Sequence, residues 1–162
     1  MTGESGELDI LTAEVLEASR PLLALAVRSM AASGPQITAA QFRALLILAR
    51  RGPLSLKELA HRLGLQSPTV SRLCSRLLAK GLIDRRPSPT SRRSVELSAS
   101  AAGQAIIDSV FEERRIALRE ILASLSPADR AGVRDALAVF ARAARAIRRQ
   151  ALETDTEFQP TA

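Results

Sequence analysis

Residues 55–81 read SLKELAHRLGLQSPTVSRLCSRLLAKG, and the turn signals in this stretch decide the fold. Ser55 and Glu58 have the spacing of a capping box, which predicts a short helix that begins there and stops at Gly64. Ser67, as an N-cap residue followed by a proline, predicts a second helix that runs to the end of the stretch. Two short helices joined by a glycine-containing turn are typical of a helix-turn-helix.

The segments on either side extend this motif to a winged helix-turn-helix. Upstream, Thr38 predicts the N-cap of a helix over residues 39–50. Downstream, residues 82–86 and 95–99 predict two short strands, because apolar and polar residues alternate in the second of them. Residues 87–93 are a Pro/Ser-rich loop with a basic end, so the two strands are expected to form a hairpin, or wing. The chain therefore predicts a mainly α fold with a small β-hairpin wing.

Helical patterns flank the winged domain on both sides. Pro21 interrupts the N-terminal pattern, which predicts a kink or a helix that restarts at Arg20. A last helix is predicted to begin at Ser126-Pro127 and to carry a heptad seam of apolar residues. Such a seam needs a partner, either a second copy of the chain or residues 101–125 of the same chain. The residues predicted to hold a homodimer are Leu11, Val15, Val133, Leu137, Phe140, Ala144 and Ile147.

The predicted organisation follows from these patterns. With 162 residues, the chain suits one domain with an appended oligomerisation element. The winged helix-turn-helix is expected at residues 38–100, between helical dimerisation segments at 8–37 and 101–153. Disordered tails are expected at residues 1–7 and 154–162.

The basic residues are concentrated in one third of the chain. Residues 43–93 contain twelve Lys and Arg but only Glu58 and Asp84 as acids, whereas the whole chain has a net charge of +6. Residues 1–19 contain five acids and no base. A basic block of this kind predicts a surface for a polyanion, with a uniformly solvated basic face as the alternative.

The polar face of the second helix suits the major groove of duplex DNA. Its small hydroxyl side chains allow close approach, its N-terminal amides can bind phosphate, and an arginine one or two turns in can reach the O6/N7 edge of guanine. Arginines at the wing tip suit the narrow minor groove, and those on the first wing strand suit phosphates. The predicted DNA-binding residues are Gln66, Ser67, Thr69, Ser71, Arg72, Ser75, Arg76, Arg85, Arg86, Arg92 and Arg93.

Composition excludes several other classes of function. A single Cys and a single His supply no disulfide framework, no metal site and no paired nucleophile, and the chain has no Gly-rich phosphate loop. We therefore expect no enzyme activity, no metal and no cofactor. Without Tyr or Trp, a platform that stacks single-stranded bases is not expected either. Cys74 is predicted to be buried as a small apolar residue, and His61 to lie on the outer side of its helix.

No targeting or membrane segment is expected. The acidic start lacks the basic flank and the apolar run of a signal peptide. Residues 22–30 are apolar but too short to span a bilayer, and they include Arg28. The sequence therefore predicts a cytoplasmic protein with no membrane partner.

Several short motifs follow one another in a fixed order between residues 38 and 103. In this order they resemble the MarR (multiple-antibiotic-resistance regulator) family of winged-helix transcription factors. The flanking helices match that family in layout rather than in motif. The motifs are Thr38-Ala-Ala-Gln41-Phe42, Gly52-Pro-Leu-Ser-Leu-Lys-Glu-Leu-Ala60, Ser67-Pro-Thr-Val-Ser-Arg-Leu73, Lys80-Gly-Leu-Ile83 and the wing residues Arg85, Pro89 and Arg92-Arg93.

The resemblance implies a symmetric dimer that binds a roughly palindromic duplex and represses transcription. Many such regulators release DNA when a small ligand binds, whereas others have no ligand and act constitutively. Without Tyr or Trp, a ligand pocket in this chain would be apolar, with Phe42 or Phe111 in its lining. At the wing, where the family has an acid that orients the tip arginine, this chain has Ser91 before Arg93. A serine carries no charge, so we expect weaker discrimination by the wing.

Two other functions are compatible with the same residues. The chain could be an architectural DNA binder without sequence preference, or a winged helix that docks an acidic protein. Loss of the Arg72 side chain separates the three: a selective loss of about 1–3 kcal/mol at one site marks specific binding. An equal loss on every duplex marks the architectural protein, and no tight duplex binding marks the docking module.

Overall fold

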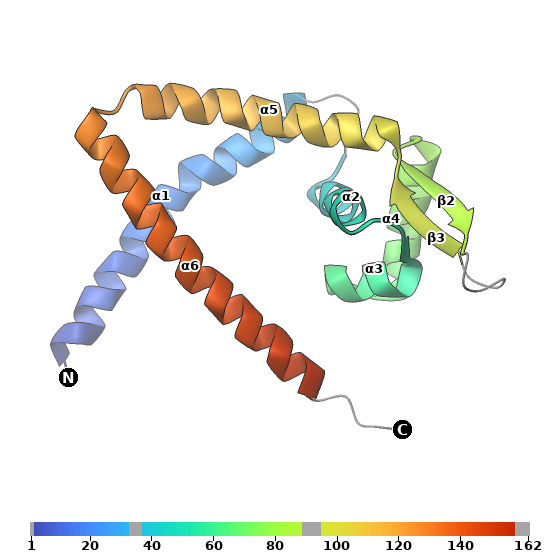
Figure 1. Cartoon of the computed structure of the whole chain (residues 1–162), viewed down its shortest axis with the longest axis horizontal. Coiled ribbons are helices and arrows are strands. Elements are labelled where there is room, and N and C mark those ends of the chain that lie inside the picture. The colour runs from blue at the N-terminus through green and yellow to red at the C-terminus, as the bar shows by residue number, and fades with distance from the viewer. Residues whose placement is uncertain (1, 33–36, 89–94, 158–162) are drawn as a thin grey trace. The chain divides into compact units, whose positions relative to one another are not determined.

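The computed structural model describes residues 2–32, 37–88 and 95–157, and it confirms a mainly helical fold with a small antiparallel sheet (Figure 1). The chain divides into two compact units, Met1–Ala117 and Leu118–Ala162. The elements follow the order α1 (Thr2–Ala32), α2 (Ala39–Arg51), β1 (Leu54–Ser55), α3 (Leu56–Leu63), α4 (Ser67–Ala79), β2 (Ile83–Pro87), β3 (Val95–Ala99), α5 (Ala101–Ala123) and α6 (Pro127–Glu157).

Two helices of the winged domain begin with reciprocal capping boxes. At α2, Thr38 Oγ1 accepts a hydrogen bond from Gln41 N at 3.2 Å, and Gln41 Oε1 accepts one from Thr38 N at 2.9 Å. At α3, Ser55 and Glu58 form the same box. The hydrogen bonds from the Ser55 hydroxyl and then from its backbone N–H lower the pKa of the Glu58 carboxyl group. Both predicted helix starts are confirmed, because each box satisfies N–H groups that the first helical turn leaves unpaired.

The turn between α3 and α4 differs by one residue from the sequence prediction. Gly64 ends α3 in the left-handed conformation, with φ at 66°, as expected. The N-cap of α4 is Gln66, and Ser67 is already helical, so the prediction of Ser67 as N-cap is wrong. The Gln66 carbonyl oxygen accepts hydrogen bonds from Thr69 N at 3.0 Å and Val70 N at 3.1 Å. The backbone of Gln66 therefore begins the helix, and no side chain caps it.

The wing belongs to a three-stranded antiparallel sheet with the strand order β1-β3-β2. β2 pairs with β3 over the whole length of both strands, which confirms the predicted hairpin. The sequence does not predict β1, in which Leu54 lies opposite Leu97 of β3. Two residues are too few to show an alternating pattern, so periodicity cannot signal such a strand.

One hydrophobic core joins α2, α3, α4 and the sheet to the first part of α5. Gly103 of α5 lies where the backbone of Leu82 passes close to the helix. A Cβ atom on Gly103 would clash with the Leu82 carbonyl oxygen and would lie 2.8 Å from Leu45 Cδ1. α5 therefore packs tightly against the segment that leads into β2. The largest side chains with less than 2% exposure are Leu45, Leu48, Leu59, Leu77, Val70 and Val110.

α1 is one helix with Pro21 inside it, so the predicted restart at Arg20 is not observed. A proline in a helix removes one backbone hydrogen bond but does not prevent the helix from continuing when other contacts support it. Arg20 Nη1 lies 3.1 Å from Glu17 Oε2, and this ion pair spans the turn just before the proline.

Both terminal helices are longer than the sequence predicts. α1 begins at Thr2, so the tail predicted at residues 1–7 is helical from residue 2. α6 continues to Glu157, past the predicted end at residue 153, and no Gly or Pro interrupts the sequence there. The rest of the predicted C-terminal tail, residues 158–162, lies outside the described residues.

In the second unit, side-chain hydrogen bonds hold the turn between α5 and α6. Ser126 Oγ accepts a hydrogen bond from Asp129 N at 3.1 Å, which caps α6 where the sequence predicts its start. Arg130 Nε donates to the Leu122 carbonyl oxygen at 2.8 Å, and Arg130 Nη2 donates to that of Ala123 at 2.7 Å. The last carbonyl groups of α5 are thereby satisfied by a cation, which the helix dipole favours at this end.

Candidate nucleic-acid interface

α4 separates a buried face from an exposed one. Val70, Leu73, Cys74 and Leu77 point into the core. All of the predicted DNA-binding residues that the structure describes are exposed, namely Gln66, Ser67, Thr69, Ser71, Arg72, Ser75, Arg76, Arg85 and Arg86. The predicted wing-tip residues Arg92 and Arg93, with Ser91, lie outside the described residues.

The exposed arginines of α4 and β2 form no ion pair with any described residue. Within residues 2–32, 37–88 and 95–157, ion pairs join Arg20 to Glu17 in α1 and Arg115 to Glu112 in α5, and neither pair lies on the winged face. The only hydrogen bond of Arg72 in these segments runs from Nε to the Pro68 carbonyl oxygen at 3.5 Å, at the outer limit for such a bond. The guanidinium groups on this face are therefore available to an anionic partner.

The hydroxyl groups of α4 lie close to the helix surface. Ser75 Oγ donates a hydrogen bond to the Ser71 carbonyl oxygen at 2.9 Å, one turn earlier. This local bond keeps the Ser75 side chain against the helix. The short hydroxyl side chains of this face allow the helix backbone to approach the bases closely.

The register of the wing separates Arg85 from Arg86. Arg85 lies opposite Leu97, and Arg86 lies opposite Glu96. Directly opposed residues of an antiparallel pair share one face of the sheet, so the two arginines are on opposite faces. Arg85 lines a small pocket of about 120 Å³ together with Ser71 and other residues of α4. Of the two, Arg85 therefore adjoins the recognition helix, whereas Arg86 has a carboxylate as its cross-strand neighbour.

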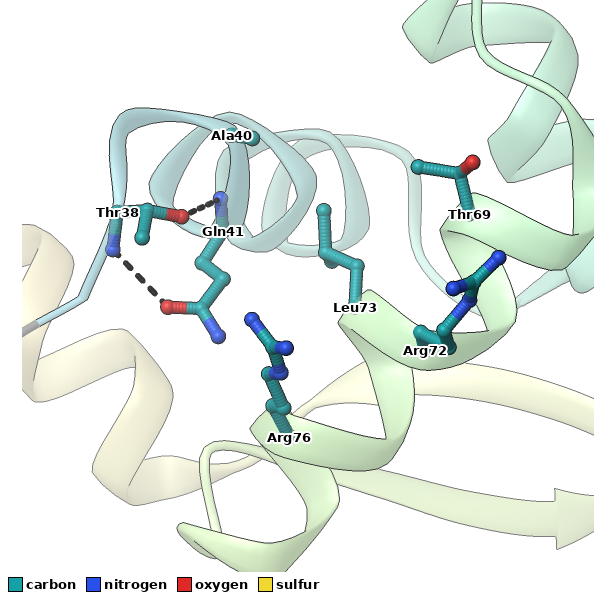
Figure 2. Close-up of a pocket in the computed structure, with 7 residues that line it drawn as sticks. All are labelled: Thr38, Ala40, Gln41, Thr69, Arg72, Leu73 and Arg76. Atoms are coloured by element: carbon teal, nitrogen blue, oxygen red, sulfur yellow. Dashed lines mark hydrogen bonds between the residues drawn. The ribbon is translucent and has the colours of Figure 1, made fainter.

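A larger pocket, of about 310 Å³, lies between the start of α2 and the flank of α4 (Figure 2). Figure 2 shows that Gln41 of α2 and Arg76 of α4 point toward the same part of this pocket, whereas Arg72 extends in the direction of Thr69. The pocket is lined by Thr38, Ala40, Gln41, Thr69, Arg72, Leu73 and Arg76.

Gln41 is a candidate functional residue that the sequence analysis does not single out. It is only 4% exposed, and its Oε1 atom is used in the capping box with Thr38. Within the part of the chain that the structure describes, its Nε2 atom has no hydrogen-bond partner. The Thr-x-x-Gln spacing at the start of α2 signals the box but not the direction of the free amide nitrogen.

Arg114 of α5 joins α1 to the winged domain. Its Nε donates to Ser29 Oγ at 2.8 Å and its Nη2 donates to the Ala26 carbonyl oxygen at 3.2 Å. Its guanidinium carbon lies 5.8 Å from the ring centroid of Phe42 and 5.6 Å from that of Phe111, within range of cation–π attraction. The two phenylalanines predicted to line an apolar pocket thus lie together, but a cation covers both rings.

Cys74 and His61 lie where the sequence places them. Cys74 is buried in the core, and desolvation by this burial raises the pKa of its thiol to about 11. His61 is exposed on α3. In the described ranges, the His, Cys, Asp and Glu side chains form no cluster of three or more that could hold a metal ion. No helix in these ranges combines the length and the hydropathy needed to cross a bilayer.

Large apolar side chains predicted to hold a dimer are exposed within the single chain. In α6, Leu137, Phe140 and Ile147 are 57%, 56% and 68% exposed. In α1, Leu11 is 53% exposed and Val15 is 38% exposed. Exposed apolar area on this scale is typical of a surface that a partner covers.

Comparison with known proteins identifies relatives of this winged fold. Residues 37–95 match the model of the MarR family. The crystal structure of RV1404 from Mycobacterium tuberculosis is 39% identical in sequence, with a TM-score of 0.76 over 85% of this chain and 93% of that one.

Two curated relatives are named as transcriptional proteins. The transcriptional repressor NicR of Pseudomonas putida is 29% identical over 108 residues, which cover 67% of this chain and 68% of NicR. The transcriptional regulator YfiV of Bacillus subtilis is 27% identical over 103 residues, 64% of this chain. The match spans just under two thirds of the length of YfiV, namely 64%.

Proposed function

This chain belongs to the MarR family of transcriptional regulators, and we propose that it is a homodimeric repressor that binds a specific, roughly palindromic DNA operator. The observation that carries the proposal is the exposed face of α4, where hydroxyl groups and arginines without a carboxylate partner lie side by side. In this proposal the protein acts on chromosomal DNA and therefore in the cytoplasm.

Sequence recognition is assigned to α4. The helix enters the major groove, with Ser67, Thr69 and Ser71 close to the base edges and Arg72 long enough to reach guanine O6 and N7. Arg85 and Arg86 supply charge at the backbone, and Arg92 and Arg93 supply it at the wing tip. The N-terminal amides of α4 also favour a phosphate, because Gln66 caps the helix without a side-chain bond.

Dimerisation through the terminal helices would place two copies of α4 on one duplex. The exposed seam of Leu137, Phe140 and Ile147, with Val133 and Ala144 in the same heptad pattern, supports a helix-to-helix contact between copies. Leu11 and Val15 of α1 are further exposed apolar residues that a second copy would cover. A two-fold dimer requires a palindromic operator, because each half-site meets an identical helix.

The proposal also includes repression of transcription and release of the DNA when a small ligand binds. The name of the Pseudomonas putida relative supports repression. Release requires a ligand with different affinities for the DNA-bound and free states. Arg114 is suited to transmit such a change, since its guanidinium joins backbone and side-chain atoms of α1 to the Phe42 ring of the winged domain. A small apolar or aromatic ligand near these rings would compete with that cation.

The test is the effect of Arg72→Ala on an operator selected from a random duplex pool. We expect a loss of about 1–3 kcal/mol on the selected operator and a much smaller loss on a scrambled duplex. Arg115→Ala is the matched control, because Arg115 is an exposed arginine already paired with Glu112 in α5. Equal losses on both duplexes would favour an architectural protein, and the absence of tight duplex binding by the wild type would favour a protein-docking module.

A further inference from the structure

The pocket between α2 and α4 holds two donor groups, Gln41 Nε2 and the Arg76 guanidinium, that form no hydrogen bond with another described residue. Gln41 uses its amide oxygen on the Thr38 N–H, which fixes the orientation of the amide and directs Nε2 toward Arg76 (Figure 2). Among the described residues, Arg76 forms no ion pair or side-chain hydrogen bond. An arginine side chain and an amide nitrogen can only donate hydrogen bonds. The chemistry of the pocket therefore suits an acceptor that carries negative charge.

We propose that Gln41 and Arg76 together hold one backbone phosphate of the bound DNA, so that Arg76 positions α4 and does not contact a base. A phosphate offers several acceptor oxygens, and a guanidinium can bind two of them at once. This inference rests on the proposed DNA-binding function and assigns a role within it.

The placement of the pocket favours a phosphate over a base edge. Arg76 turns from the flank of α4 toward the start of α2, whereas a base contact needs a side chain that extends from the helix into the floor of the groove. The positive end of the α2 dipole adds to the attraction for an anion at this point. α2 lies beside α4 at this pocket, so its N-terminus can approach the DNA backbone when α4 enters the groove.

The same geometry divides the two arginines of α4 between different tasks. Arg72 does not share the direction of Arg76 and extends toward Thr69, at the N-terminal part of the helix (Figure 2). The N-terminal part of a recognition helix is the part that contacts bases. Arg72 is therefore the arginine that determines sequence, and Arg76 is a positioning residue.

The first experiment measures the affinity of each variant for the selected operator and for a scrambled duplex at several salt concentrations. Arg76→Ala is expected to bind both duplexes about tenfold more weakly at low salt and to reduce the salt slope by about 1. Arg76→Lys is expected to restore part of the affinity, because it keeps the charge but not the planar fork. A loss for Arg76→Ala on the operator alone, with the scrambled duplex unaffected, would overturn the assignment.

Gln41→Glu tests the second member of this pair, Gln41 and Arg76, which we call the phosphate clamp. The carboxylate keeps an acceptor for the Thr38 N–H, so the capping box is retained, but it replaces the amide donor with a negative charge. We expect weaker binding to both duplexes, with the helical circular dichroism signal retained as the check that the variant folds. Gln104→Glu, the same change on the exposed Gln104 of α5, is the control for net charge. If Gln41→Glu and Gln104→Glu bind DNA with equal affinity, Gln41 does not contact the phosphate.

The final experiment identifies the phosphate itself. Operators that carry one neutral methylphosphonate at successive positions are bound to the wild type and to Arg76→Ala. We expect one position per half-site where neutralisation weakens the wild type about tenfold and leaves Arg76→Ala unchanged. If the loss from Arg76→Ala and the loss from the methylphosphonate add at every position, Arg76 contacts none of these phosphates, and the proposed phosphate contact is refuted.

A titration with inorganic phosphate at constant ionic strength separates a DNA phosphate from a free anion. Stabilisation of the wild type but not of Gln41→Glu by millimolar phosphate would assign the pocket to a small anion instead. A wild type that binds all duplexes equally would refute the proposed sequence-specific function. The phosphate clamp would still be tested in that case, because its effect is the same on every duplex.

Discussion

Gly103→Ala tests how closely α5 must approach the winged domain. The added Cβ would clash with the Leu82 carbonyl oxygen, which already accepts a hydrogen bond from Ser100 N at 3.1 Å, and would lie 2.8 Å from Leu45 Cδ1. Leu45 can change its rotamer, but the Leu82 backbone is held on both sides, since Leu82 N donates to the Leu77 carbonyl oxygen at 2.9 Å. α5 must therefore move away from β2.

The expected loss follows from two opposing effects. Overpacking of a dense core costs about 1–3 kcal/mol, or more when the backbone must shift. Replacement of glycine by alanine in a helix returns about 1 kcal/mol at most. We therefore expect the free energy of unfolding to fall by about 1–2 kcal/mol, which lowers the melting temperature of a chain of this size by about 2–8 °C.

Thermal melting of wild type, Gly103→Ala and Gly132→Ala at one chain concentration checks this expectation. Gly132 lies in α6 with no heavy atom within 4 Å of an added Cβ, so its replacement keeps the helix gain without the clash. The concentration is held constant because dimerisation raises the apparent stability. If Gly103→Ala melts as high as Gly132→Ala, the close packing of α5 on Leu82 does not constrain the domain.

Three further predictions concern the dimer, the wing and the buried thiol. Leu137→Asp is expected to give a folded monomer in sedimentation measurements, because Leu137 is 57% exposed within the chain and does not belong to its core. A variant that stays dimeric would contradict the proposed dimer contact through α6. Ser91→Asp is expected to sharpen the base preferences in a binding-site selection, because the resemblance implies that an acid orients Arg93; unchanged preferences contradict this. Burial raises the Cys74 pKa to about 11, above that of the exposed thiol in the unfolded chain. The protonated thiol therefore contributes fully to the free energy of unfolding at neutral pH, and this contribution is lost as the pH rises through 11. Denaturant unfolding between pH 8 and pH 11 should show a steeper fall for wild type than for Cys74→Ala, and equal slopes would contradict the burial effect.

Local turn chemistry made the winged domain predictable from sequence. Thr38, Ser55 and Gly64 act through hydrogen bonds and backbone angles within a few residues, so their types and spacing are sufficient to place the helices. The family assignment follows from the same motifs. It also places the chain in a family of transcriptional regulators.

Features that depend on tertiary contacts could not be predicted from the sequence. The two-residue strand β1 exists because Leu54 meets Leu97 of a distant strand, and no local pattern encodes that pairing. The sequence pattern predicts the same role for Arg72 and Arg76, because both lie on one polar face of a helix. Their different directions become visible only when α2 is placed beside α4 and Gln41 faces the pocket.

The proposed sequence-specific regulator is best tested by selection from a random duplex pool, followed by titration of the winning duplex and a scrambled one at several salt concentrations. We predict a palindromic winner that the wild-type protein binds at least about 10³ times more tightly than the scrambled duplex. Equal affinities for the two duplexes, with a steep dependence on salt, would mean that phosphate neutralisation accounts for all of the binding and would contradict this function.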